Sequence, residues 1–304
     1  MTRTLSSGPR EERGPDGRER PYISVVIAVR NGAATLEACL DSVLGQTYPD
    51  WELIVIDGAS TDGTQEIIRR QADKIAFWVS EPDRGIYNAW NKALDHASGS
   101  WMIFLGADDR FADSTVLSRA SAALHDAEGP YGVVYGALRI LDERGNEVRV
   151  EGDAWPSVRD GFRTEMTIPH PATFHHRSLF ARRGRFDERF RIAGDYEFLL
   201  RELLDRDALF IADLVLVDMA LGGISSRPEN LARVMLENQR ARRMHGLGWG
   251  PPALSPAVVR LRSKAAIYRA FGPRVGALAS RLYHIAVDAV RSVGSRSRPR
   301  DGGS

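Results

Sequence analysis

Residues 101–110 read WMIFLGADDR, an apolar run of strand length that ends in a small-residue turn and two adjacent carboxylates. Such a run is typical of a strand buried on both faces of a parallel sheet. Asp108 and Asp109 then follow the carboxyl end of that strand, where open α/β sheets bind their ligands. Two hard oxygen ligands suit a divalent cation such as Mg²⁺ or Mn²⁺. Because Asp is also common in turns, a plain loop is the alternative interpretation of this stretch alone.

The residues before this stretch repeat the same pattern. Apolar runs at 23–29, 51–56 and 75–80 end in polar or glycine-rich turns, and segments with helical spacing separate them. This alternation predicts an α/β fold of Rossmann-like type, with a mostly parallel sheet, right-handed crossovers and helices on both faces. The carboxyl ends of the strands should share one edge of the sheet, so we expect Asp57 and Glu81 to lie near Asp108 and Asp109.

The second half of the chain has a different pattern. Residues 133–140 and 148–150 flank a turn and predict a hairpin, 169–175 and 209–217 predict further strands, and 195–204 predict a helix. We expect one continuous domain over residues 21–226, made of two halves at about 21–129 and 130–226. Residues 227–294 should form a helical C-terminal extension, and residues 1–20 and 295–304 should be disordered because they contain almost no apolar side chains.

Composition limits the setting of the protein. The single cysteine, Cys39, cannot form an internal disulfide, which fits a reducing cytoplasm. No window approaches the roughly 20 apolar residues of a membrane-spanning helix. Residues 251–304 carry a net charge of +8 within a chain of net charge +1, and an apolar stripe runs through 275–289. Residues 251–294 could therefore dock on an anionic membrane surface, on the inner face of the membrane, or pack on the domain.

The chain lacks several familiar nucleotide-site and hydrolase motifs. No Gly-x-Gly-x-x-Gly follows the first strand, and neither a Gly-x-x-x-x-Gly-Lys-Ser/Thr loop nor a Gly-x-Ser-x-Gly elbow is present. A nucleotide-sized edge lined with carboxylates remains. Asp57 could accept a hydrogen bond from a nucleobase, Asp108 could bind ribose hydroxyls, and Asp109 could hold a cation that neutralises a departing diphosphate. These groups indicate glycosyl transfer from a nucleotide sugar.

Such a reaction also needs a base for the incoming hydroxyl. The candidate is Asp195 in the segment IAGDYEF at 192–198, at the start of a predicted helix. An N-cap is the alternative role, since Asp is preferred there, and Glu197 is a second candidate base. His170 could contact the acceptor or the diphosphate, with a structural histidine as the alternative.

Seven segments, in order along the chain, resemble those of family-2 glycosyltransferases of the GT-A fold. The resemblance runs from about residue 23 to residue 225, and its closest subgroup builds exopolysaccharide, lipopolysaccharide or cell-envelope glycolipids. The matching segments are 24–27 with 31–32, 51–64, 80–92, 106–109, 170–174, 194–197 and 222–225.

The resemblance implies roles for individual residues and an inverting reaction by a single displacement. It implies a divalent cation (Mn²⁺ or Mg²⁺), a nucleotide-sugar donor and a glycan or lipid-linked acceptor; a nucleic acid is not among the expected partners. The implied roles are base contact for Asp57, ribose or diphosphate contact for Asp108, metal binding for Asp109, catalytic base for Asp195, and nucleobase-pocket residues at Ala28, Val29, Asn31, Glu81 and Asp83.

The chain departs from the family pattern at one position, and two alternative functions remain. The family pattern is often Asp-x-Asp, and Gly106 stands at its first position here. A sugar-phosphate nucleotidyltransferase would share the α/β nucleotide fold, but it would need a glycine-rich phosphate loop after the first strand. A non-catalytic scaffold of an envelope-assembly complex could use the basic tail, although the presence of Asp109 and Asp195 argues against it.

Overall fold

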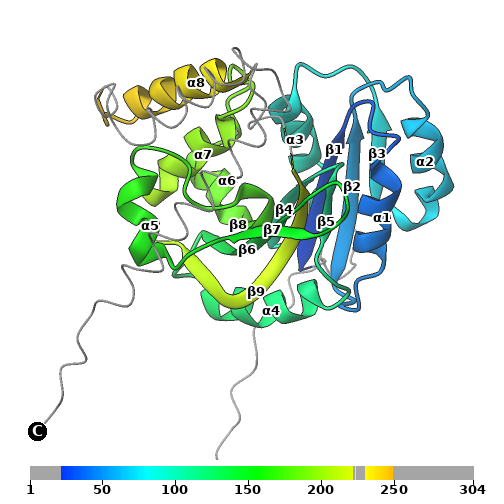
Figure 1. Ribbon diagram of the computed structural model, residues 1–304, viewed down its shortest axis with the longest axis horizontal. Coiled ribbons are helices and arrows are strands. Elements are labelled where there is room, and N and C mark those ends of the chain that lie inside the picture. Colours follow the sequence, from blue (N-terminus) through cyan, green and yellow to red (C-terminus); the bar gives the residue numbers. More distant parts are fainter. Residues whose placement is uncertain (1–21, 222, 224–229, 249–304) are drawn as a thin grey trace, which may run out of the picture.

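The computed structural model describes residues 22–221, 223 and 230–248 (Figure 1). The strands are β1 (Ile23–Val29), β2 (Trp51–Asp57), β3 (Phe77–Ser80), β4 (Trp101–Gly106), β5 (Asp109–Phe111), β6 (Val133–Leu141), β7 (Glu147–Glu151), β8 (Thr173–His176) and β9 (Leu209–Ala220). The α-helices are α1 (Leu36–Leu44), α2 (Thr64–Arg70), α3 (Ile86–Leu94), α4 (Val116–Ala127), α5 (Trp155–Phe162), α6 (Arg177–Arg183), α7 (Gly194–Leu203) and α8 (Leu231–Met244).

All nine strands belong to one sheet. Its order is β3-β2-β1-β4-β8-β6-β9-β5, with β7 paired to β6. The pairs among β1 to β4 are parallel, whereas β8, β7 and β5 run against their neighbours, so six of the nine strands point in one direction. The strand order reverses between β1 and β4, and the crevice outside the carboxyl ends of such strands is the usual ligand site. The predicted α/β fold with a mostly parallel sheet is confirmed.

Each face of the sheet has its own apolar core. Along β1, Val25 and Ile27 join the core that α1, α2 and α4 cover, while Val26 faces the core that α3 and α7 cover. This alternation follows from the two-residue period of a strand. Strands β1 and β4 are buried on both sides because helices cover both faces, which explains their continuous apolar sequences.

The structure differs from the sequence-based expectations in several elements. The expected strand at 169–175 begins with a 3-10 turn at His170–Ala172, and only Thr173–His176 form a strand. The segment after Asp108, for which no strand was predicted, contains strand β5, which exists because it pairs with the distant β9. Helices α4, α5 and α6 were not predicted. The predictions for residues 1–20, for 222 and 224–226, and for the tail from 249 onward lie outside the described residues.

Candidate functional site

The loop after β1 is fastened to the loop after β2. Asn31 adopts a positive φ of 52°; its backbone N–H donates to Ser60 Oγ (2.7 Å), and its side-chain oxygen accepts from the Thr61 N–H (3.0 Å). Ala28 and Val29, the last residues of β1, pair in register with Ile56 and Asp57 of β2. The structure therefore brings Ala28, Val29, Asn31 and Asp57 together at the carboxyl edge of the sheet.

Asp57 is completely buried at the end of β2, and its carboxylate binds protein groups on both sides. It accepts hydrogen bonds from the backbone N–H and hydroxyl of Ser60 and, at 2.5 Å, from the hydroxyl of Ser80 at the end of β3. These contacts fix the loop after β2 and the end of β3 relative to one another. The contact of Asp57 with a nucleobase stays a prediction.

Asp57→Ala should destabilise the fold by about 1–3 kcal/mol, because it leaves the Ser60 N–H and two hydroxyls without their acceptor. Urea unfolding monitored by circular dichroism measures this change. Asp73→Ala, at an exposed carboxylate in the 3-10 turn before β3, serves as the control and should stay within about 0.5 kcal/mol of the parent protein. Equal stability of both variants would contradict a structural role for Asp57.

Glu81 and Asp83 follow β3 on the same edge. Asp83 accepts the Gly85 N–H at 2.9 Å, and its carboxylate lies against the α-carbon of Gly58, where a Cβ would be 2.3 Å from Asp83 Oδ2. Glu81 is exposed and forms an ion pair with Lys92 at 2.8 Å. Asp83 thus lines the edge beside Asp57, whereas Glu81 points toward α3.

The two carboxylates after β4 occupy different environments. Asp108 is exposed, whereas Asp109 is 4% exposed and accepts the Gly106 N–H at 2.8 Å. A Cβ on Gly106 would lie 2.8 Å from Asp108 Oδ1 and 3.0 Å from Asp109 Oδ2. Burial, and then the charge of Asp108, raise the pKa of Asp109 to about 7. Gly106 therefore leaves room for two carboxylates to converge, and a cation between them would relieve their repulsion.

Asp195 lies in the first turn of α7 and is tied to α3. Its Oδ1 accepts the Tyr196 N–H (2.8 Å) and lies 3.2 Å from the Tyr87 hydroxyl. Tyr87 also packs on the bare α-carbon of Gly194, where a Cβ would be 2.7 Å from the Tyr87 ring. Burial raises the pKa of Asp195 to about 6, against the opposing effect of these two hydrogen bonds. The group is therefore a stronger base than an ordinary aspartate.

The two other candidates have mainly structural contacts. Glu197 is 1% exposed and pairs with Arg201 and with His245, whose Nε2 is 3.0 Å away. Burial raises its pKa, but the hydrogen bonds from His245 and Arg201 outweigh this and hold the pKa below its ordinary value. His170 is buried against Trp90, with ring centroids 4.9 Å apart, and burial lowers its pKa to about 3. His170 is therefore neutral, and its contact with an acceptor or diphosphate stays a prediction.

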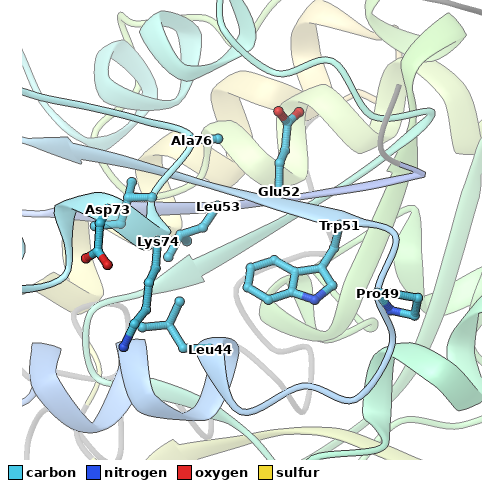
Figure 2. A pocket seen from close by; sticks show the side chains of 9 residues that line it. Leu44, Pro49, Trp51, Glu52, Leu53, Asp73, Lys74 and Ala76 are labelled. Carbon is cyan, nitrogen blue, oxygen red and sulfur yellow. The ribbon is translucent and has the colours of Figure 1, made fainter. Parts of the chain in front are cut away.

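A cavity of about 460 Å³ lies at the opposite end of β2 (Figure 2). Trp51, the first residue of β2, and Lys74 line it, while Asp57 is the last residue of the same strand. Seven residues of strand span roughly 20 Å. This cavity is therefore remote from the carboxylate edge.

Within the described ranges, no helix is long and apolar enough to cross a membrane, and no cluster of three or more His, Cys, Asp or Glu side chains has the geometry of a metal site.

A GT-A fold with carboxylates at the ends of β2 and β4 defines the class of protein, and the sequence comparison agrees. The model of the family described as "Glycosyl transferase family 2" matches residues 24–190. The chain belongs to this family and is a glycosyltransferase, which excludes the nucleotidyltransferase and scaffold alternatives.

Sequence relatives agree with this assignment. A PGL/p-HBAD biosynthesis glycosyltransferase of Mycobacterium bovis is 36% identical over 186 residues, 60% of this chain and 69% of the relative. An uncharacterized glycosyltransferase of Mycobacterium tuberculosis is 35% identical over 210 residues, 69% of this chain and 79% of the relative.

Two solved structures share the fold at low sequence identity. The mannosyltransferase PcManGT of Pyrobaculum calidifontis, in complex with GDP-Man and Mn²⁺, has a TM-score of 0.58 at 22% identity and covers 95% of this chain and 83% of its own. Staphylococcus aureus TarS in complex with UDP-GlcNAc has a TM-score of 0.59 at 18% identity and covers 81% of this chain and 70% of its own.

Sequence reasoning missed four residues that support the candidate site: Ser60, Ser80, Tyr87 and Glu237. Ser60 has a local signal, because an Asp three residues before a Ser favours a side-chain turn. Tyr87 and Glu237 meet the segment 191–195 from α3 and α8, at separations of more than 40 residues. Neither periodicity nor a motif could indicate those contacts.

Proposed function

We propose that this chain transfers a sugar, with inversion, from a nucleotide sugar to a hydroxyl of a glycan or lipid-linked acceptor during cell-envelope glycolipid or exopolysaccharide synthesis. The observation that carries the proposal is Asp195, a partly exposed carboxylate with a raised pKa in the first turn of α7. It lies 3.2 Å from the hydroxyl of Tyr87, which belongs to α3, the helix that follows β3. The glycolipid role of the mycobacterial relative supports the acceptor class.

In the proposed reaction, Asp195 accepts the proton of the acceptor hydroxyl while that oxygen bonds to the anomeric carbon. The bond from this carbon to the diphosphate breaks in the same step, on the opposite face of the sugar. The Tyr87 hydroxyl, whose pKa burial raises far above its ordinary value, stays protonated; it donates to the Ile192 carbonyl and lies 3.2 Å from Asp195 Oδ1. The acceptor must lie in line with the leaving group for this displacement to be fast.

The donor side of the proposed site lies along the carboxyl edge of the sheet. Ala28, Val29 and Asn31 form one wall, Asp83 forms the other, and Asp57 fixes the loop between them. Asp108 and Asp109 fit a divalent cation, because they are hard oxygen donors that converge on Gly106. A cation bound there would neutralise charge on the departing diphosphate. The membrane-docking role of residues 251–294 stays a prediction.

The proposed function is tested by mixing the protein with UDP-, GDP-, dTDP- and CDP-sugars, each with and without Mn²⁺, and identifying the nucleotide released. A transferase releases the nucleoside diphosphate. Release should be slow when the sugar is transferred to water and faster when it is transferred to an acceptor. Thermal melting with the four nucleoside diphosphates identifies the donor class, since ligand at about 100 times its Kd adds roughly 2.7 kcal/mol of stability. Failure of all four to bind would contradict a nucleotide-sugar donor.

The proposed base predicts the pH dependence of turnover. Asp195 must be ionised to accept a proton, and its pKa is about 6. The value of kcat/KM for donor hydrolysis should therefore fall about tenfold per pH unit as the pH drops below about 6. Saturating Mn²⁺ in the assay keeps Asp109 ionised, so its titration does not overlap. A profile that stays flat down to pH 4.5 would contradict the base assignment.

A further inference from the structure

The backbone that precedes Asp195 is held by a carboxylate from a distant helix. Glu237 on α8 accepts three consecutive backbone N–H groups, those of Arg191 (3.0 Å), Ile192 (2.8 Å) and Ala193 (2.9 Å). Ala193 is the N-cap residue of α7. Figure 1 shows α8 lying across α7 and away from the first four strands.

The remaining polar groups of this segment are bound from a second helix. Tyr87 on α3 donates its hydroxyl proton to the Ile192 carbonyl (2.6 Å) and accepts the Gly194 N–H (2.7 Å). Two side chains, from α3 and α8, thus bind the backbone from 191 to 194. Asp195 is the next residue, so its carboxylate has little freedom to move relative to these two helices.

We propose that Glu237 is a positioning residue for the glycosyl transfer step: it holds the 191–193 backbone so that Asp195 points at the acceptor hydroxyl. This inference rests on the proposed function, in which Asp195 is the base. A carboxylate that accepts three N–H groups at the start of a helix also stabilises that helix end, so the test must separate the two roles.

Among the described residues, side chains of two other helices act on Asp195. Tyr87 of α3 lies 3.2 Å from its carboxylate, and the charge of Glu237 on α8 acts on it from the preceding backbone, while Glu197 on its own helix pairs with Arg201 and His245 instead. The charge of Glu237 adds to the effect of burial in raising the pKa of Asp195. Removal of that charge should therefore lower the pKa of Asp195, and this change can be observed separately from any loss of helix stability.

Loss of Glu237 should not detach α8. Ala241 of this helix is buried in the apolar core, the Arg240 guanidinium lies 4.8 Å from the Phe190 ring centroid, and His245 contacts Glu197. Variants at position 237 can thus be compared as folded proteins. Gln239→Ala is the matched control, because Gln239 lines an outward-facing groove of the same helix.

The first measurement is turnover of the full chain in the nucleotide-sugar panel with Mn²⁺. Glu237→Ala should lower kcat by about 10²-fold, the scale expected when a reacting group is displaced by about 1 Å. Its KM for the donor, and its melting shift with UDP or GDP and Mn²⁺, should stay within about twofold of the parent protein, because Glu237 holds no donor-side group. Gln239→Ala should match the parent protein in all three.

The second measurement is the pH profile of Glu237→Gln, which keeps an acceptor oxygen but removes the charge. The acid limb of kcat/KM should move to lower pH, because the pKa of Asp195 falls. Amide hydrogen exchange should show faster exchange at 191–193 in Glu237→Ala than in Glu237→Gln. If Glu237 were only a structural cap, its replacement in a folded protein would neither slow turnover nor shift the acid limb.

Two results would overturn the inference: a Glu237→Ala variant with kcat within about twofold of the parent protein, or a Glu237→Gln variant whose acid limb does not move. Asp195→Asn, assayed in parallel, separates this failure from that of the proposed function. If Asp195→Asn is inactive and Glu237→Ala is normal, only the positioning role is wrong. If Asp195→Asn turns over normally, the base assignment itself is wrong.

Discussion

Asp195→Asn should reduce glycosyl transfer by about 10²–10⁴-fold and leave nucleotide binding intact. The asparagine has the same shape, and its side-chain oxygen can still accept the Tyr196 N–H, so α7 should begin as before. The amide has no basic lone pair for the acceptor proton. The loss should therefore lie in kcat, because the interaction removed is one made as the proton moves.

The measurement is donor turnover at pH 7.5 together with thermal melting in UDP or GDP with Mn²⁺. Asp205→Asn, at an exposed carboxylate just beyond the end of α7, is the matched control and should keep full activity. If Asp195→Asn also lost the nucleotide-induced melting shift, the residue would belong to the donor site instead of the acceptor side. Normal turnover by Asp195→Asn would assign the base to another residue.

Asp108→Ala should abolish the Mn²⁺-dependent part of nucleotide binding without lowering the stability of the unliganded protein. Its side chain is exposed, so its removal disturbs no packing, whereas the buried Asp109 accepts the Gly106 N–H. Asp126→Ala, at an exposed carboxylate on α4, controls for the loss of one negative charge. An unchanged Mn²⁺ response in Asp108→Ala would place the cation elsewhere.

Asp109→Asn separates the second carboxylate from the first. In the parent protein the pKa of Asp109 is about 7, so cation binding at pH 6 must displace a proton, and Mn²⁺ affinity should rise with pH through this range. Isothermal titration of Mn²⁺ with UDP or GDP at pH 6 and pH 8 should show this difference in the parent protein. The difference should be smaller in Asp109→Asn, where the terminal phosphate of the nucleotide still titrates in this range. If both proteins respond to pH equally, Asp109 does not contribute to the cation site.

Local sequence patterns determined the first half of the fold. The continuous apolar runs of β1, β2 and β4 can be buried only in a sheet covered on both faces, and the turns after them mark the carboxyl edge. For this reason Asp57, Glu81, Asp108 and Asp109 were assigned to one edge from sequence, although Glu81 turns to pair with Lys92 of α3. The strand order, with β4 beside β1, then follows the common doubly wound arrangement.

Contacts between distant segments decided the remainder. Asp109 is buried because β5 pairs with β9, more than 100 residues later, and such a three-residue strand has no periodicity of its own. Glu197 and Asp195 are equally acidic in sequence, yet the direction of each side chain on α7 leaves one paired with His245 and the other beside Tyr87. The sequence by itself determined which carboxylates are candidates for the chemistry. Only the tertiary structure decided which carboxylate pairs with Arg201 and His245 and which lies beside Tyr87, because burial and charge pairing depend on neighbours that the chain brings together from α3 and α8.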